Sequence, residues 1–312
     1  MINGIINVYK EQGFTSHDVV AKLRGILKMK KIGHTGTLDP DAVGVLPVCL
    51  GKGTKLCDLL TDKDKTYETV LLLGQTTDTQ DTSGTILTQK EAVYTEEEIK
   101  EAVAEFVGDI MQIPPMYSAL KVNGKKLYEL AREGIEIERK ARPITVFQIR
   151  ILEINTISVI EEATGENLTQ MEVRMTVHCS KGTYIRTLCH DIGERLGCGG
   201  CMKELKRTQV ANFLIEDSLK LSDLEQLKRE DKIESVVVAV DEMFPKAPKV
   251  TVAKEFSKFI YNGNTFTKRH LKDKIDSDGL AEVRVYDSEG TFVGLYEYDH
   301  EKKCFKVVKM FL

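Results

Sequence analysis

The chain has 312 residues, of which 42% are hydrophobic and 29% are charged, and its formal net charge at pH 7 is −4. This length suits one large domain with a smaller one, and the composition is that of an ordinary globular protein. The sequence contains no run of eighteen apolar residues for a membrane span, and its first residues lack the basic start and apolar stretch of a signal peptide. We therefore expect a cytoplasmic protein without a membrane partner.

The first half of the chain alternates between helical and strand patterns. Apolar residues recur at helical spacing over 16–29, where Ser16 is the candidate N-cap. Residues 67–73 form a compact β-prone apolar run, which predicts a buried strand. Thr95 and Glu98 form a capping box that predicts a helix over 96–107.

Strand and helix patterns follow each other again in the second half. Apolar and polar residues alternate over 171–179, which predicts a half-buried strand. Residues 184–196 have helical spacing, and Gly197 is placed to end that helix. Together with the first half, this order predicts a mixed α/β fold of the α+β type.

The C-terminal part has a different character. Three short strands are predicted there, separated by polar turns, at 281–286, 292–298 and 305–310. Pro245 and Pro248 bracket a candidate linker. We therefore expect a large domain over 1–245 and a small all-β domain over 249–312.

Charge is strongly partitioned along the chain. Residues 120–150 carry a net charge of +4 and residues 245–275 carry +6, whereas residues 76–109 carry −7. Basic runs are often only solvated faces. Two positive segments on an otherwise acidic chain also fit a surface that binds a polyanion, because phosphate contacts supply most of the affinity for nucleic acid.

The cysteines do not indicate a metal site. There are seven, and they are scattered, which fits reduced thiols. Cys198 and Cys201 form a single C-x-x-C pair without a second paired cluster, whereas a structural zinc site needs four ligands. We expect no metal, and we assign the two glycines between these cysteines to a tight turn after a helix.

The run from Gly33 to Pro40, Gly-His-Thr-Gly-Thr-Leu-Asp-Pro, is the most informative stretch. Asp39 followed by Pro40 is what a helix start looks like, with Asp as N-cap and Pro at the first helical position. Gly33 and Gly36, however, permit close backbone approaches that capping does not require. Asp39 is therefore either a cap or a functional carboxylate, and both roles are compatible if Pro40 begins a short helix.

This run resembles the G-H-x-G-x-L-D-P signature of the TruB family of tRNA pseudouridine synthases. The resemblance extends in order along nearly the whole chain, through residues 44–51 with Lys55, 64–67, 73–79, 112–121, 124–128, 141–144, 179–186 and 205–208. It implies a pseudouridine synthase fold, with a mixed and mainly antiparallel central sheet flanked by helices and loops. It also implies conversion of uridine 55, in the T arm of tRNA, to pseudouridine without a metal or organic cofactor.

The resemblance assigns roles to particular residues. Asp39 is the catalytic nucleophile or base, and whether it attacks C1′, attacks C6 or removes the C2′ proton stays open. Arg186 is its guanidinium partner, which would orient the carboxylate and lower its pKa. Tyr67 stacks on the target base, and its ordinary alternative is a core aromatic. The substrate-binding residues implied are His34, which helps to extrude the uridine, with Tyr184, Leu205 and Lys55.

Two further segments are implied to bind RNA. The basic stretch at about 120–145 resembles a thumb-like insertion that clamps the T stem-loop, and its ordinary alternative is a charged hairpin or helix. The C-terminal strands, with Gly263 and the Gly290-x-x-x-Gly294 spacing, resemble a PUA domain, a β-barrel-like RNA-binding unit. We expect tRNA as the partner of a monomer that needs no other protein.

Two alternatives remain open at this point. One is a guide-RNA-dependent pseudouridine synthase of the dyskerin type, which shares the Asp loop and the PUA domain but lacks the thumb-like insertion. The other is an RNA-binding or RNA-folding module with an inactive pocket, which the joint presence of Asp39, Tyr67 and Arg186 disfavours.

Overall fold

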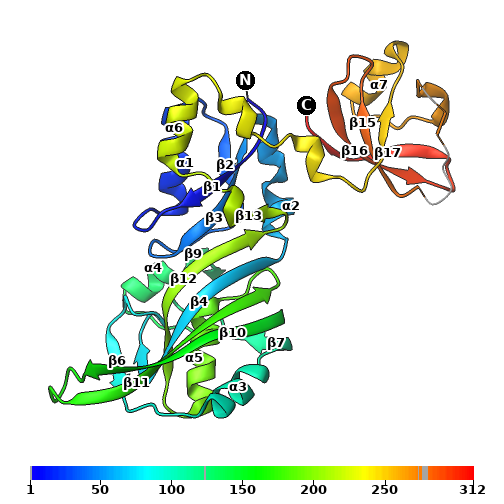
Figure 1. Cartoon of the computed structure of the whole chain (residues 1–312). Helices are drawn as coiled ribbons and strands as arrows, with labels where there is room; N and C mark the ends of the chain where they lie inside the picture. Colours follow the sequence, from blue (N-terminus) through cyan, green and yellow to red (C-terminus); the bar gives the residue numbers. More distant parts are fainter. Residues whose placement is uncertain (1, 123, 273, 276–279) are drawn as a thin grey trace.

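A long twisted sheet runs through the larger part of the molecule, as the computed structural model shows (Figure 1). The structure describes residues 2–122, 124–272, 274–275 and 280–312. Within this part of the chain, nine strands form the main sheet. The order across it is β1 (Gly4–Lys10), β3 (Val43–Leu50), β12 (Gly200–Val210), β4 (Lys65–Leu73), β11 (Asn167–Cys179), β10 (Arg142–Ile160) and β7 (Gly108–Gln112), with β2 (Ile32–His34) beside β3 and β13 (Phe213–Leu214) beside β12.

The sheet is antiparallel except at one place. Strands β3 and β12 pair in parallel, with Val43 opposite Lys206 and Gly44 opposite Arg207, whereas the other neighbouring pairs are antiparallel. The predicted mixed α/β class with a mainly antiparallel sheet is therefore confirmed. The parallel pair is also where the N-terminal strands join the rest of the sheet.

Helices cover the sheet in two groups. The helices are α1 (Ser16–Leu27), α2 (Cys57–Thr61), α3 (Glu96–Ala104), α4 (Leu127–Arg132), α5 (Ile185–Leu196), α6 (Leu221–Arg229) and α7 (Ser257–Tyr261). Helices α1 and α6 pack with β1 and β3 around one apolar cluster. Helices α3 and α5 pack on β4, β10, β11 and β12 around another.

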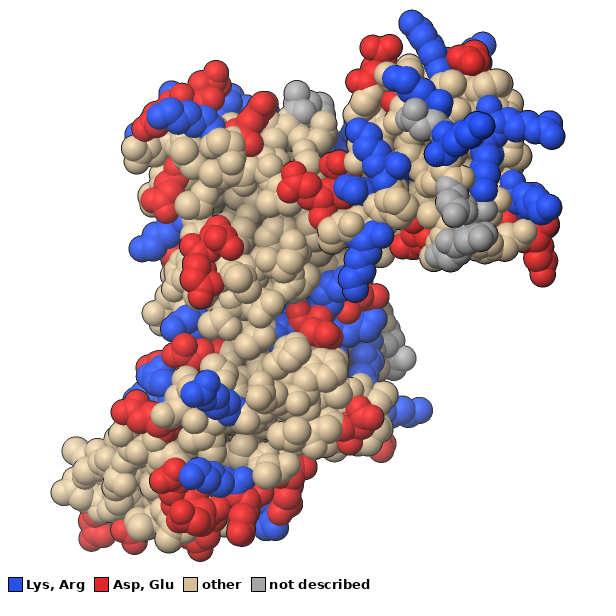
Figure 2. Space-filling model, turned by 45° about the vertical axis from the view of Figure 1, so that its right-hand side comes forward, with Lys and Arg blue, Asp and Glu red and all other residues tan. Residues whose placement is uncertain are grey.

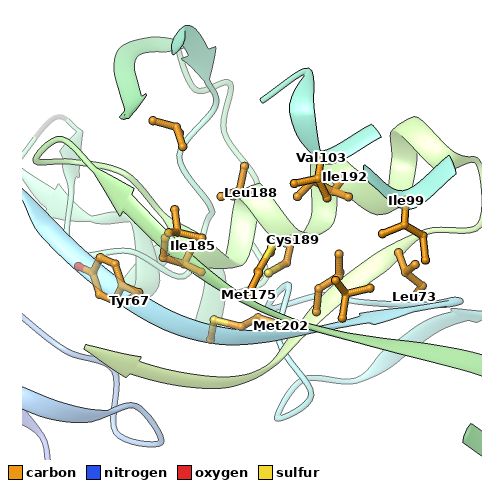
Figure 3. Packing of buried hydrophobic residues seen from close by; sticks show 14 of the residues in the cluster. Tyr67, Leu73, Ile99, Val103, Met175, Ile185, Leu188, Cys189, Ile192 and Met202 are labelled. Carbon is orange, nitrogen blue, oxygen red and sulfur yellow. The ribbon is translucent and has the colours of Figure 1, made fainter. Parts of the chain in front are cut away.

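The second cluster is built from the inner face of α5. In Figure 3 the sheet residues Met175 and Met202 lie below α5, and Val103 of α3 lies beside Ile192. The buried residues that α5 gives to this cluster include Ile185, Leu188 and Ile192. These positions recur at three- and four-residue intervals, so they share one face of the helix. Burial of this face anchors α5, and with it the start of the helix that carries Arg186.

A second sheet forms the C-terminal part, coloured orange to red in Figure 1. Its order is β14 (Lys249–Thr251), β15 (Glu282–Tyr286), β16 (Phe292–Asp299) and β17 (Cys304–Met310). The three C-terminal strands predicted from the sequence are confirmed, and β14 is an additional strand that pairs in parallel with β15. Phe292 and Phe311 pack against Phe244, in a cluster that also contains residues of β1 and β3.

Two small hairpins lie outside these sheets. They consist of β5 (Gln75–Thr77) with β6 (Ile86–Gln89), and of β8 (Lys121–Val122) with β9 (Lys125–Lys126). The second hairpin and α4 occupy the basic stretch, whereas Arg142 and the residues after it belong to β10 of the main sheet. The basic stretch therefore comprises a small hairpin, a short helix and the start of a strand of the main sheet.

Most of the predicted element boundaries agree with the structure. Strands β4 and β11 contain the predicted 67–73 and 171–179, and Gly197 ends α5 in a left-handed conformation with φ of 82°. The capping box at the start of α3 is present, but this helix ends at Ala104 and a turn replaces its predicted last residues.

The predicted N-cap of α1 is wrong by one residue. Thr15, not Ser16, caps the helix, because its hydroxyl accepts from the Asp18 N–H while the Asp18 carboxylate accepts from the Thr15 N–H. Two adjacent hydroxyl residues made the sequence ambiguous, and Asp18 at the third helical position decides between them.

The packing of α5 predicts a stability difference between two leucines. Leu188→Ala, at a fully buried position, is expected to lower the free energy of unfolding by about 2–5 kcal/mol, because it leaves a cavity. Leu59→Ala, at an exposed helical position, is the matched control and should cost less than about 1 kcal/mol. Urea denaturation followed by circular dichroism measures both, and equal losses would contradict this account of the core.

Candidate active site

Asp39 lies in a loop that joins β2 to β3 and runs beside the parallel β3–β12 pair. No helix follows it in this described part of the chain: the Ala42 N–H donates to the Asp39 carbonyl at 3.2 Å in a single turn, and β3 begins at Val43. The helix-cap interpretation of Asp39 and Pro40 is therefore wrong. Because the Asp39 side chain caps nothing and is 43% exposed, its carboxylate is open to a ligand.

Two buried polar side chains hold this loop from opposite ends. The Ser16 hydroxyl accepts from the Leu38 N–H at 2.9 Å, directly before Asp39. The Lys10 ammonium, which is fully buried, donates to the Pro40 carbonyl at 2.9 Å, directly after it. Asp39 is thus flanked on both sides by anchored backbone.

Arg186 is the partner of the Asp39 carboxylate. Its Nε lies 3.1 Å from Asp39 Oδ2, and its side chain is only 6% exposed. The rest of the guanidinium donates to the Thr79 carbonyl at 3.0 Å and the Tyr117 carbonyl at 2.7 Å, and Nη1 lies 3.6 Å from Asp81 Oδ2. Arg186 therefore fixes the direction of the carboxylate and connects three loops to the start of α5.

Tyr67 lies on β4, directly opposite Arg207 on β12. Its side chain is buried in the cluster under α5, and this burial raises the pKa of the phenol, with a smaller contribution from the charge of Asp39. The hydroxyl is therefore protonated at neutral pH. The ring combines an apolar face, suited to a flat base, with one polar atom near the carboxylate.

Tyr184 and Leu205 lie beside this centre. Tyr184 immediately precedes α5, and Gln112 holds it by bonding both its N–H (2.8 Å) and its carbonyl (3.0 Å). Burial raises the pKa of the Tyr184 phenol, and the charge of Asp39 adds to the rise. Leu205 lies two residues before Arg207 on β12 and packs against the same cluster as Tyr67. The structure thus gathers Asp39, Arg186, Tyr67, Tyr184 and Leu205.

His34 is at the start of the same loop. Its ring packs edge-on against the ring of His17, with centroids 5.2 Å apart, and its buried Nδ1 has no hydrogen-bond partner among the described residues. Burial lowers the pKa of His34, and the nearby His17 lowers it further. A neutral imidazole with an unused nitrogen is suited to contact a polar ligand atom.

Lys55 is not brought to this centre. It follows β3 in the short 3₁₀ helix Gly51–Leu56, at the far end of the strand from Asp39, and an eight-residue strand spans roughly 25 Å. Its ammonium donates to the Leu312 carbonyl at 3.1 Å. The geometry therefore gives Lys55 a contact to the C-terminal part rather than one to the reacting groups.

Three residues of the centre were not predicted from the sequence. Asp81 contacts Arg186, Lys10 holds Pro40, and Arg207 is buried behind Tyr67. Burial lowers the pKa of the Lys10 ammonium to about 8, although the charges of Asp39 and Asp41 oppose the shift. Arg207 lies two residues after Leu205, and residues at this spacing share one side of a strand. This spacing was the one feature of the sequence that placed Arg207 near the centre.

The described residues contain no group of three or more His, Cys, Asp or Glu side chains placed to hold a metal ion. They also contain no helix long and apolar enough to cross a membrane. Cys198 and Cys201 are both buried, and Gly199 between them has φ of 78°, as the predicted turn before β12 requires.

Chemically, the centre offers one oriented carboxylate, one protonated phenol and an apolar wall, at a place that is partly open to solvent. The guanidinium of Arg186 stabilises the ionised carboxylate through a charge-assisted bond. The Asp39 carboxylate can act here as a nucleophile or as a base on a nucleotide whose flat uncharged base is held against Tyr67.

The chain matches two family models. Residues 24–185 match the TruB family pseudouridylate synthase model for the N-terminal domain, and residues 186–244 match the model for the tRNA pseudouridylate synthase B C-terminal domain. Together with the fold and the carboxylate centre, these matches define the class as the pseudouridine synthases.

Curated relatives match over the full length. Proteins described as tRNA pseudouridine synthase B are 56% identical in Lachnoclostridium phytofermentans, over 100% of both chains, and 45% identical in Alkaliphilus oremlandii, over 99% of this chain and 98% of the relative. The chain belongs to the TruB family.

Solved structures agree on the fold. A Cbf5-Nop10-Gar1 complex contains a chain that matches with a TM-score of 0.69 and 27% identity, covering 99% of this chain and 85% of that one. An H/ACA RNP bound to a substrate RNA containing 2′-deoxyuridine matches with a TM-score of 0.68 and 25% identity, over 99% and 85%.

The buried Lys10 predicts how stability depends on pH. The ammonium loses its proton at a pH of about 8 in the folded chain but near 10.5 in the unfolded chain, so the folded state binds fewer protons between these values and stability rises with pH across this window. Below pH 8 the full cost of burying the charge remains. The two pKa values differ by an amount that corresponds to at most about 3 kcal/mol.

In Lys10→Met the contribution of the Lys10 ammonium to the pH dependence of stability is absent. The rise in the free energy of unfolding from pH 8 to 10.5 should therefore be smaller than in the wild type, whereas Lys30→Met, at an exposed position, should keep the wild-type slope. Urea titrations at a series of pH values measure the slopes, and identical slopes for all three proteins would refute the burial of a charged Lys10.

Proposed function

We propose that this protein converts the uridine at position 55 of tRNA, in the T arm, to pseudouridine, with Asp39 as the reacting carboxylate. The observation that carries the proposal is the Asp39–Arg186 pair, in which a nearly buried guanidinium orients a half-exposed carboxylate. Full-length relatives that are described as tRNA pseudouridine synthase B support the activity.

The reaction breaks the bond between N1 of uracil and C1′ of ribose and forms a bond between C5 and C1′. The C5 proton is lost and N1 takes up a proton, so that the product is an isomer of the substrate. Asp39 would start it by attack at C1′, by attack at C6 or by removal of the C2′ proton. Tyr67 would hold the detached uracil against its ring, and Leu205 and Tyr184 would line the same pocket. Because the base must leave its stack to reach Asp39, His34 would contact the displaced nucleotide.

Two basic parts of the surface support tRNA as the substrate. Around residues 120–141, Lys121, Lys125 and Lys140 are exposed beside the site loops. The eight basic residues of the 245–275 segment are all exposed, and Figure 2 shows Lys and Arg crowding the C-terminal sheet while Asp and Glu gather at the opposite end of the molecule. This distribution suits an RNA that lies across one side, from the insertion to the C-terminal part.

The same features support a division into domains. We propose a catalytic domain over 1–245, with a thumb-like insertion at about 120–145, and a PUA-like RNA-binding domain over 249–312. The second family match ends at residue 244, and the C-terminal strands form a sheet of their own. With tRNA as substrate, the protein would act in the cytoplasm as a single chain.

The guide-RNA-dependent alternative has weaker support. The matching chains of the Cbf5 and H/ACA complexes are 25–27% identical to this chain, whereas the relatives described as tRNA enzymes reach 43–56%. The charged insertion with β8, β9 and α4 also favours direct clamping of a stem-loop.

An assay with purified protein tests the activity. A tRNA transcript that carries tritium at C5 of its uridines should release tritium to water when incubated with the wild-type protein alone. Asp39→Asn is expected to lower the single-turnover rate by at least about 10⁴-fold, because the reacting group is lost, and to keep tRNA binding in a filter assay. A transcript with cytidine at position 55 is the substrate control, and no release from the uridine transcript would sink the proposal.

Binding should weaken steeply with salt. Lys121→Ala and Lys272→Ala, at exposed basic positions, are each expected to reduce the slope of log Kd against log salt by up to about 1, as for one phosphate contact. Lys100→Ala, on α3 in the acidic segment and paired with Glu96, is the control that should leave the slope unchanged. Filter binding between 50 and 200 mM salt measures the slopes, and a flat response would count against these surfaces.

A further inference from the structure

Arg207 on β12 is the largest side chain in the described part of the chain that is almost completely enclosed, with 1% exposure. Burying a guanidinium costs several kcal/mol unless hydrogen bonds replace its lost water. No carboxylate among the described residues forms an ion pair with it, and the cause of its lowered pKa is burial. An enclosed and unneutralised charge at this place needs an explanation beyond packing.

The bonds of Arg207 go to the two ends of the Asp39 loop. Its Nε donates to the Val45 carbonyl at 2.8 Å, in β3 after the loop. Its Nη2 donates to the Gly36 carbonyl at 3.4 Å, three residues before Asp39. The guanidinium of Arg207 therefore joins the two ends of the Asp39 loop, at the point where β3 and β12 pair in parallel.

Arg207 also lies beside Tyr67. The two residues are paired across the β4–β12 ladder, and the positive charge of Arg207 opposes the rise that burial causes in the pKa of the Tyr67 phenol. The guanidinium is therefore placed to stabilise negative charge that develops on the phenol oxygen.

Two glycines near Arg207 have positive φ, one in the loop and one at the start of β3. Gly44 has φ of +106°, and a Cβ there would lie 2.2 Å from the Arg207 carbonyl oxygen. Gly36 has φ of +80°, and its Cβ would lie 3.7 Å from Arg207 Nη1. The loop backbone thus adopts conformations that glycine favours while it passes close to Arg207.

We propose that Arg207 is a positioning residue of the isomerisation, which fixes the loop of Asp39 to strand β12 and holds it in register with Tyr67 on the neighbouring strand. The inference rests on the proposed roles of Asp39 and Tyr67. Arg207 is enclosed and forms no ion pair with Asp39; it acts through the Gly36 and Val45 carbonyls and through its charge beside Tyr67.

The test is the single-turnover rate of tritium release with saturating protein. Arg207→Met is expected to lower this rate by about 100-fold, since a reacting group displaced by 1 Å loses a factor of this size, while the Kd for tRNA stays within about threefold because no phosphate contact is removed. Arg207→Lys keeps the positive charge but loses the planar set of guanidinium donors, and it should recover part of the rate.

Arg174→Met is the matched control. Arg174 also contacts strands β4 and β12, through Glu68 and Glu204, which alternate with Tyr67 and Leu205 and so lie on the other face of the sheet. This variant should keep the wild-type rate. Thermal unfolding of each variant separates a loss of positioning from a loss of fold.

A double-mutant cycle with Tyr67→Phe supplies a readout that a merely structural role would not move. If Arg207 acts through the phenol, Arg207→Lys should lower the rate less in the Tyr67→Phe background than in the wild type. If Arg207→Met does not fold, Arg207→Lys alone carries the test. A folded Arg207→Lys protein with the wild-type rate, or additive effects in the cycle, overturns the inference.

The outcome for Asp39→Asn keeps this inference separate from the proposed function. Tritium release that survives Asp39→Asn would show that the reaction centre lies elsewhere, whatever Arg207 does. Release that is lost with Asp39→Asn but unchanged with Arg207→Met would overturn only the role of Arg207.

Discussion

A half-exposed carboxylate has to be held in one direction while it stays open to its substrate, and a single guanidinium meets this requirement. Arg186 binds Asp39 from the protein side and is itself held by two carbonyls and a second carboxylate. Its position depends on α5, whose apolar face is buried against the sheet. The packing of an ordinary amphipathic helix is therefore what gives the loop carboxylate its orientation.

Several cations are enclosed around this carboxylate, and this arrangement has a cost. Arg186, Arg207 and Lys10 are all nearly or fully buried, and they bind mainly backbone carbonyls of the loops that they hold. Carbonyl acceptors compensate desolvation less fully than an ion pair with good geometry. In return, the loop around Asp39 keeps a fixed position while the Asp39 side chain stays half-exposed, which leaves the carboxylate open to a nucleotide. We regard this as local stability given up for a preformed site.

Much of the fold could be predicted from the sequence because it follows from local patterns. Alternation identified β11, helical spacing and Gly197 identified α5, and the Thr95 capping box identified α3. The Asp39–Arg186 pair came from motif resemblance rather than from spacing, since 146 residues lie between the two positions. The roles of Lys10 and Arg207 could not be predicted, because tertiary contacts decide whether a cation is buried. Lys55, which the resemblance implied as a substrate-binding residue, lies away from the centre because the whole length of β3 separates it from the Asp39 loop.

The parallel pairing of β3 with β12 has a consequence for how the molecule moves. Only two residue pairs form this part of the ladder, Val43 with Lys206 and Gly44 with Arg207. The large clusters around α1 and α5 share no residue, and a smaller cluster joins Val45 of β3 to Val210 of β12. Regions with few shared buried contacts open at lower free energy than the whole domain. Amide hydrogens along the β3–β12 pair should therefore exchange with solvent by sub-global opening rather than by unfolding of the whole domain, and the reaction centre lies directly beside this short parallel pair.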